Sequence, residues 1–267
     1  MQMQSSGKNI ASFSTDPLQN EKRDNSSDTT HNIKHDLWEA MLYSPIAGNY
    51  SNFWRQSNAT QMLGYAKLAV LLWDAQGKTI LDYGCGTGEF TKIMNEKGAH
   101  VIGVDVSQGM IAIARDNDTQ GDYRLIKAWD DLQEIPCVDD IMINYVFCTF
   151  DKEEKIQTAL CLLSQLIKIW WKIYIQNGNR DDANWLDFLS FWLEKKENLK
   201  EWDEIYAILK WVASTGDLRV KDFFFSKMTY MQLLMKAGFT HIKIYEMKEE
   251  QTSDIAPVYI IEWTKLS

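Results

Sequence analysis

The hydrophobic pattern between residues 79 and 176 alternates short apolar runs with stretches of helical period. This order, strand then helix repeated, is typical of a parallel sheet with helices on both faces. The predicted strands are Thr79–Tyr83, His100–Asp105, Tyr123–Ala128, Asp140–Val146 and Trp170–Gln176. The predicted helices between them are Glu89–Lys97, Gln108–Arg115 and Lys152–Ile167.

The pattern changes on either side of this core. Residues 36–50 and 58–73 have apolar side chains at helical spacing, which predicts an N-terminal helical lid over residues 34–75. Residues 177–225 interrupt the alternation and carry aromatic side chains at roughly helical intervals, which predicts two helices that form a cap.

The C-terminal part, residues 226–267, returns to the earlier rhythm. A helix at Met228–Ala237 is followed by two strands, His241–Met247 and Val258–Trp263, which we expect to form an antiparallel pair at the sheet edge. The fold class expected is therefore α/β: a doubly wound, seven-stranded Rossmann-like sheet, mostly parallel, with an antiparallel edge strand and a helical lid and cap.

The first 33 residues are polar and have almost no spaced apolar positions, so we expect a disordered tail ahead of a single domain over residues 34–267, with its core at 76–176. The tail has no apolar segment of the kind that directs secretion, and no run of eighteen apolar residues occurs. Four cysteines without paired spacing give no support for disulfides or a zinc site. These features favour a cytoplasmic protein with reduced thiols.

The informative motif is the glycine-rich turn that follows the first predicted strand. It runs Asp82-Tyr83-Gly84-Cys85-Gly86-Thr87-Gly88 and leads into a helix. Alternating glycines let the backbone pass close to a ligand. Asp105 ends the second strand, where a carboxylate can accept hydrogen bonds from both ribose hydroxyls of an adenosine-containing cofactor. The spacing differs from the dinucleotide pattern G-x-G-x-x-G, and an acid suits a positive amine better than a pyrophosphate.

Asp82–Gly88 resembles the first motif of class I S-adenosylmethionine-dependent methyltransferases, and the segment from Val104 to Ile111 resembles their second. The resemblance implies S-adenosylmethionine as the cofactor. It places Asp82, Gly84, Cys85, Gly86 and Gly88 in the loop around the methionine part, Asp105 at the ribose, and Val106 and Met110 on either side of the adenine.

Three further positions follow from the family pattern. An acid after the third strand usually binds the adenine amine, and here the choice between Trp129, Asp130 and Asp131 stays open. Tyr50 and Arg55 are the candidates to close over the methionine carboxylate, with ordinary packing or surface roles as the alternative.

The candidates for contact with the acceptor follow strands four and five. Asn144 and Tyr145 stand where the family lines the cleft between cofactor and acceptor, and Asn144 is also a candidate cofactor residue. Asp181, with Asn177, Asn179 and Asp182, lies at the carboxyl edge of the sheet and can orient an acceptor amine or cap the next helix. None of the four histidines is a convincing base, although an Asp, Glu or Tyr can serve instead, and no metal-ligand cluster is apparent.

We therefore expect methyl transfer to a small-molecule acceptor, with nitrogen ahead of oxygen or carbon. Two alternatives are a reaction of the methionine chain that releases methylthioadenosine, and a cofactor-binding module without turnover. The net charge of -9 disfavours a nucleic-acid partner, no membrane association is expected, and the sequence leaves the oligomeric state open.

Overall fold

The structure is a computed structural model, and it describes residues 46–56, 59–181, 187–210, 217–249 and 255–266. The tail over residues 1–33 and the predicted helical stretch up to residue 45 lie outside the described residues. Among the described residues, no helix is long and apolar enough to cross a membrane.

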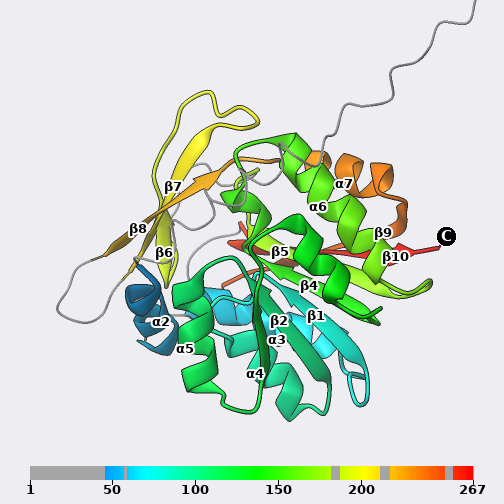
Figure 1. Ribbon diagram of the computed structural model, residues 1–267. Helices are drawn as coiled ribbons and strands as arrows, with labels where there is room; N and C mark the ends of the chain where they lie inside the picture. Colours follow the sequence, from blue (N-terminus) through cyan, green and yellow to red (C-terminus); the bar gives the residue numbers. More distant parts are fainter. Residues whose placement is uncertain (1–45, 57–58, 182–186, 211–216, 250–254, 267) are drawn as a thin grey trace, which may run out of the picture.

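A seven-stranded sheet forms the centre of the molecule, with strand order β3-β2-β1-β4-β5-β10-β9 (Figure 1). Its strands are β1 (Thr79–Tyr83), β2 (His100–Asp105), β3 (Asp122–Leu125), β4 (Asp140–Asn144), β5 (Lys172–Gly178), β9 (Phe239–Met247) and β10 (Val258–Lys265). The pairs from β3 to β5 are parallel, and β10 is antiparallel to both of its neighbours. The expected mostly parallel Rossmann-like sheet is confirmed. The antiparallel strand is β10, one position inside the edge strand β9.

Helices cover both faces of this sheet. They are α2 (Ala47–Gln56), α3 (Ala59–Leu71), α4 (Glu89–Glu96), α5 (Gln108–Asn117), α6 (Glu153–Leu166) and α7 (Lys227–Lys236), with short 3-10 helices η2 (Trp129–Glu134) and η3 (Phe147–Thr149). Leu81 and Ile141 belong to the core cluster that includes side chains of α6 and α7, whereas Ile80 and Met142 belong to the cluster of α3 and α4. Burial on both faces explains why these strands have continuous apolar sequences rather than alternating ones.

The prediction of two cap helices in residues 177–225 is wrong, because the described part of this region forms strands. The region contains a three-stranded antiparallel sheet of β6 (Phe191–Leu193), β7 (Glu204–Leu209) and β8 (Leu218–Phe223), which stands beside the main sheet (Figure 1). In β8 the exposed side chains Arg219 and Lys221 alternate with the buried Val220, a period of two that fits a strand. Aromatic residues three or four positions apart suit a helix, but strands joined by turns place aromatic residues at the same intervals.

A buried polar contact fastens this small sheet to the N-terminal helix α3. The Thr60 backbone N–H donates to Ser190 Oγ at 2.9 Å, and the Ser190 N–H donates to Thr60 Oγ1 at 3.1 Å. The Thr60 hydroxyl donates to the buried carboxylate of Glu249, which also accepts from the Leu189 N–H at 3.1 Å. Because these residues are far apart in the chain, the contact joins three separate segments.

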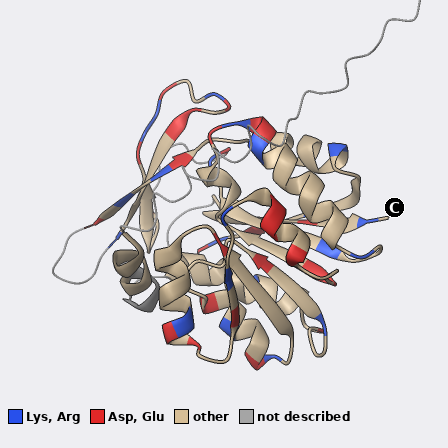
Figure 2. Cartoon of the chain, viewed as in Figure 1, with Lys and Arg blue, Asp and Glu red and all other residues tan. Residues whose placement is uncertain are grey.

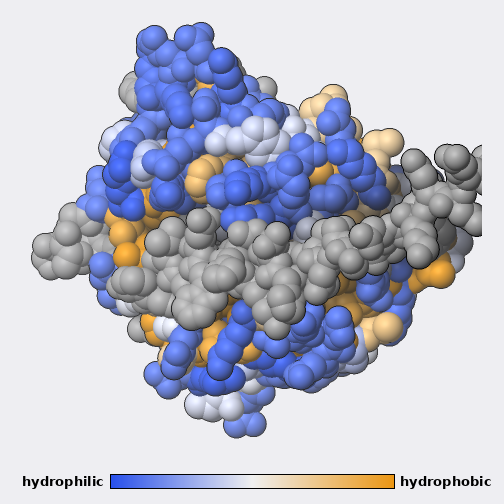
Figure 3. Space-filling view, turned by 45° about the horizontal axis from the view of Figure 1, so that its top comes forward, coloured by the Kyte–Doolittle hydropathy of each residue, from blue (hydrophilic) through white to orange (hydrophobic). Residues whose placement is uncertain are grey.

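Basic and acidic residues are interspersed along the loops, helices and strands (Figure 2). The face shown in Figure 3 is largely hydrophilic, with smaller hydrophobic patches among the described residues. The exposed Trp73 and Trp170 are the largest apolar side chains in contact with solvent among the described residues. Single exposed apolar side chains of this kind are ordinary.

Replacement of Thr60 by valine removes the hydroxyl from this buried contact but keeps the shape of the side chain. We expect the free energy of unfolding to fall by about 1–3 kcal/mol, because buried polar partners lose a hydrogen bond. Denaturant unfolding of the full chain measures the change. Thr158→Val is the matched control, because the Thr158 hydroxyl bonds to the Glu154 carbonyl on an exposed helix surface. Equal losses in the two variants would show that the buried contact adds nothing.

Candidate functional site

The glycine-rich turn between β1 and α4 adopts a backbone that favours glycine. Gly84, Gly86 and Gly88 have φ values of 78°, 54° and 84°. A Cβ at Gly84 would lie 2.2 Å from the Val146 side chain, and a Cβ at Gly88 would lie 2.7 Å from the Tyr123 hydroxyl. A Cβ at Gly86 would meet no other residue within 4 Å. Gly86 therefore faces open space, whereas the other two glycines permit close packing.

Asp105 holds this turn from the end of β2. Its Oδ2 accepts a hydrogen bond from the Gly86 N–H at 2.9 Å, and its Oδ1 accepts from the Ser107 N–H at 2.8 Å. The Ser107 hydroxyl in turn accepts from the Met110 N–H at 3.2 Å and caps α5. Burial raises the pKa of Asp105, and the three backbone N–H groups around the carboxylate oppose that rise.

A pocket of about 660 Å³, counted to its open mouth, lies against the turn and Asp105. The predicted site residues that line it are Tyr50, Gly84, Gly86, Asp105, Val106, Met110, Asn144 and Tyr145. The lining residues that the sequence reasoning missed are Tyr83, Ile126, Val146, Thr149 and Phe150. Each of these lies at or beyond the carboxyl end of a strand as the structure has it, β1, β3 or β4, which is the usual position of ligand contacts in such sheets. That position is the signal that identifies them.

Two polar side chains near the turn keep buried atoms without a partner among the described residues. Asn144 is 9% exposed, and neither its Oδ1 nor its Nδ2 makes a hydrogen bond. Asp82 is 1% exposed; its Oδ2 accepts from the Thr91 hydroxyl at 2.7 Å, and its Oδ1 has no partner. Burial raises the pKa of Asp82 to about 7, although the bond from Thr91 lowers it. An incoming hydrogen-bond donor or cation would compensate both side chains.

Asp82 and four other predicted cofactor residues do not line the pocket. Cys85 is buried and packs with Ile111 and Tyr123, and Gly88 lies against Tyr123. Trp129 is buried edge-on against Phe150, with ring centroids 6.4 Å apart, and Asp130 is exposed. Asp131 is the third candidate for the adenine amine. Its carboxylate accepts hydrogen bonds from the backbone N–H groups of residues 127 and 128.

Two candidates remain, Arg55 and Asp181. The side chain of Arg55 is not among the described ones. Asp181 is exposed, and its Oδ2 accepts from the backbone N–H of Lys227 at 2.9 Å, at the start of α7. This bond lies at a helix end, as in the capping alternative, and Asp181 is not among the residues that line either of the two pockets.

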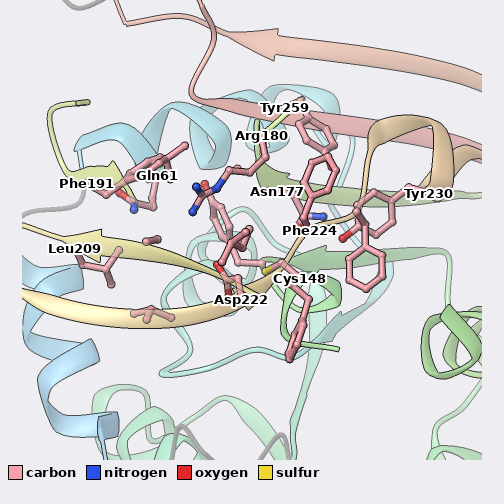
Figure 4. A pocket seen from close by; sticks show the side chains of 18 of the residues that line it. Gln61, Cys148, Asn177, Arg180, Phe191, Leu209, Asp222, Phe224, Tyr230 and Tyr259 are labelled. Carbon is pink, nitrogen blue, oxygen red and sulfur yellow. The ribbon is translucent and has the colours of Figure 1, made fainter. Parts of the chain in front are cut away.

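A second pocket of about 830 Å³, counted in the same way, lies between the main sheet and the small sheet (Figure 4). Its walls are mostly apolar and aromatic, with contributions from Phe191, Leu209, Phe224 and Tyr230. Tyr50 and Tyr145 line both pockets, so the two cavities meet at these side chains.

Tyr145 has a backbone conformation that is uncommon for a residue with a side chain. Its φ is 56°, and its N–H donates to the Gln176 carbonyl at 2.9 Å. Non-glycine residues in this region cluster at functional sites. Burial raises the pKa of the Tyr145 phenol, so the hydroxyl keeps its proton at neutral pH and can donate a hydrogen bond.

Comparison with known proteins gives a consistent picture. Residues 80–168 match the family model described as a methyltransferase domain. A ubiquinone biosynthesis O-methyltransferase from Pseudomonas paraeruginosa is 37% identical over 114 residues, which cover 41% of this chain and 48% of that protein. The chain thus spans about half the length of this curated relative.

Solved structures share the fold over most of the chain. The CcbJ methyltransferase from Streptomyces caelestis has a TM-score of 0.61 at 12% identity, covering 86% of this chain and 98% of its own. The Burkholderia thailandensis 1,6-didemethyltoxoflavin-N1-methyltransferase has a TM-score of 0.57 at 14% identity, covering 91% and 93%. At these identities the likeness shows the fold alone.

The open space at Gly86 leads to a matched pair of variants. Gly86→Ala and Gly238→Ala both place a methyl group on a positive-φ backbone with no other residue within 4 Å, so both carry a similar strain of about 1 kcal/mol. Only the first methyl group enters the pocket at the turn. We expect Gly86→Ala to weaken S-adenosylmethionine binding roughly tenfold or more in calorimetry, and Gly238→Ala to leave it unchanged. Equal affinities would mean that this face of the turn is not a ligand contact.

Proposed function

We propose that the chain, which matches a methyltransferase-domain family model over residues 80–168, is a class I S-adenosylmethionine-dependent methyltransferase that transfers the methyl group of that cofactor to a small-molecule acceptor. The observation that carries the proposal is the pair of pockets that meet at Tyr50 and Tyr145. One pocket has the glycine turn and the strand-end acid expected for the cofactor. The other has the size and apolar walls expected for a small organic molecule.

The residues present fit S-adenosylmethionine. Asp105 offers a carboxylate for the two ribose hydroxyls, and Val106, Met110 and Ile126 supply an apolar place for the adenine. The open face of Gly86 admits the methionine part beside the turn. Asp82 lies beneath the turn with one unpartnered oxygen, which suits a positive amine directly or through a bridging water.

Asn144 completes this set with two unpartnered polar atoms in the cofactor pocket. Trp129, Asp130 and Cys85 are left out of the proposed contacts, because their side chains pack elsewhere or face solvent. Ile126, which directly follows β3, lines the pocket and offers an apolar contact there instead of an acid.

The sulfonium of the bound cofactor supplies an already activated methyl group. The task left to the chain is to hold the acceptor atom in line with that group and to exclude water. Tyr50 and Tyr145 lie where the pockets meet, which is the place for this alignment. Because burial keeps Tyr145 protonated, we assign it a positioning role as a hydrogen-bond donor rather than that of a base.

The second pocket favours methyl transfer over the alternative that cleaves the methionine chain, since that reaction needs no acceptor cavity. It also disfavours a binding module without turnover. Nitrogen stays the preferred acceptor, because His100 and His241 are exposed at the start of strands and neither lines a pocket. The related proteins named above include both O- and N-methyltransferases, so they do not choose between the two.

We further propose that the chain has no nucleic-acid partner and that it works in the cytoplasm. The view in Figure 2 shows basic and acidic residues interspersed rather than a basic face, and the net charge is -9, so a nucleic-acid partner is disfavoured. Among the described residues, no group of three or more His, Cys, Asp or Glu side chains could hold a metal ion. Cys137 and Cys161 are exposed free thiols, which suits a reducing cytoplasm.

Calorimetric titration of the full chain with S-adenosylmethionine tests the cofactor. We expect Asp105→Ala to weaken binding on the order of 30-fold or more, because about 2–4 kcal/mol of charge-assisted hydrogen bonding is lost. Asp130→Ala, an exposed acid close to the pocket, is the matched control and should bind normally. If the unaltered chain does not bind the cofactor at all, the proposed function falls.

Incubation of the chain with S-adenosylmethionine alone separates methyl transfer from the alternative reaction. We expect no methylthioadenosine above the non-enzymatic rate, because the proposed reaction needs an acceptor to proceed. Liquid chromatography of the adenosine products measures this. Catalysed release of methylthioadenosine that Asp105→Ala abolishes would favour cleavage of the methionine chain.

A further inference from the structure

The acceptor pocket, defined here as the second pocket of the site, holds two charged side chains within otherwise apolar walls. They are Arg180, which follows β5, and Asp222 on β8 (Figure 4). An apolar pocket fixes the orientation of its ligand through such isolated polar groups. The inference drawn from them rests on the proposed function.

Arg180 is 8% exposed and is only partly satisfied by the protein. Its Nη2 donates to the Tyr206 carbonyl at 2.8 Å, whereas its Nη1 has no hydrogen-bond partner in the part of the chain that is described. Burial lowers the pKa of Arg180 to about 10, so the guanidinium stays charged at neutral pH. A buried N–H group of a cation is costly without an acceptor. An oxygen on the ligand would satisfy it.

Asp222 enters the pocket because β8 is a strand. Its neighbour Lys221 is exposed on the other face, and its register partner on β7 is the apolar Ile205. The charged and titratable groups that face Asp222 are Arg180, the Cys148 thiol on η3, the Tyr145 phenol and the Tyr230 phenol on α7. Burial raises the pKa of Asp222 to about 6, and Arg180 and the Cys148 thiol oppose that rise. The side chain is therefore a carboxylate at neutral pH that can accept a proton.

The position of Asp222 relative to the cofactor pocket follows from η3. Cys148, which contacts Asp222, lines the acceptor pocket, and the next residue, Thr149, lines the cofactor pocket. Tyr145 lines both. Asp222 thus lies on the side of the acceptor pocket that adjoins the cofactor pocket, where the acceptor atom must lie.

Arg180 and Asp222 together carry close to zero net charge. Arg180 presents a hydrogen-bond donor to the pocket, and Asp222 presents a hydrogen-bond acceptor beside it. We propose that the acceptor is a flat, conjugated ring with an N–H group next to a carbonyl oxygen, that Arg180 binds the oxygen, and that Asp222 is the general base for the N–H. A carboxylate ligand fits less well, because it would place a second anion beside Asp222.

The proposed step balances. The N–H proton passes to the Asp222 carboxylate, and the nitrogen electron pair forms the new bond to the methyl carbon. The carbon–sulfur bond breaks, and its electron pair stays on the sulfur, which gives S-adenosylhomocysteine. Negative charge that develops on the conjugated carbonyl oxygen is stabilised by the Arg180 guanidinium. Asp222 then releases its proton to water.

Three ring probes of similar shape test the binding part with the chain saturated in S-adenosylhomocysteine. Isoquinolone has both the N–H and the oxygen, N-methylisoquinolone lacks the N–H, and isoquinoline lacks both. We expect isoquinolone to bind best by roughly tenfold or more in calorimetry. Asp222→Asn and Arg180→Met should remove that preference. Arg180→Lys, which keeps the charge, should retain part of it.

Two variants on the outer face of the small sheet serve as controls. Arg219→Met and Glu204→Gln make the same kinds of change, and neither residue lines a pocket. Both should bind isoquinolone normally. Equal affinity for the three probes, or unchanged preference in Asp222→Asn, would overturn the proposal.

Turnover tests the base. With S-adenosylmethionine and isoquinolone, we expect S-adenosylhomocysteine and N-methylisoquinolone in equal amounts. The rate should rise as pH increases through about 6, because Asp222 must be ionised to accept the proton. Asp222→Asn should lose this rise and at least 100-fold in rate, on the order of a general base's contribution. Absence of turnover in the presence of bound cofactor would sink this inference alone, whereas absence of cofactor binding would sink the proposed function.

Discussion

The carboxylate of Asp105 is the contact on which the cofactor pocket depends. The turn from Gly84 to Gly88 has few side chains with which to pack, so its backbone must be held by hydrogen bonds. The Val104 carbonyl accepts from the N–H groups of Gly84 and Cys85 at 2.8 and 3.0 Å, and Asp105 accepts from Gly86. The second oxygen of Asp105 accepts from Ser107, which caps α5. One side chain therefore joins the turn, the end of β2 and the next helix, and it does so while it faces the pocket.

The acceptor pocket has a different kind of support, because its outer wall is a separate sheet. Thr60, Ser190 and Glu249 tie the start of that sheet to α3 and to the segment after β9. Arg180 adds a second tie through the Tyr206 carbonyl on β7. The guanidinium thus both holds the wall and directs its remaining N–H group into the cavity. A wall fixed at these two places is consistent with a pocket that is largely formed before a ligand arrives.

The sequence predicts the cofactor half of the molecule much better than the acceptor half. Continuous apolar strands such as Ile141–Ile143 are buried on both faces, and the glycine turn needs its residue types for backbone reasons, so local patterns suffice there. The small sheet has no such constraint. Its aromatic residues at 188, 191 and 192 fit a helix as well as separate strands. Asp222 belongs to no motif, and it is the packing of β8 against η3 that brings it to Cys148.

The charges of the two pockets differ in a way that suits the proposed reaction. Asp105 lines the cofactor pocket, Asp82 lies buried beneath its glycine turn, and burial raises the pKa of both. Carboxylates at this place favour a cationic ligand over a neutral one, so in the proposed reaction they would hold the sulfonium more strongly than the thioether that remains after transfer. The acceptor pocket pairs Arg180 with Asp222 and is close to neutral. As positive charge leaves the first pocket, the proton gained by Asp222 removes a negative charge from the second. In the proposed reaction, both changes reduce the electrostatic attraction between the pockets and the products, which favours product release.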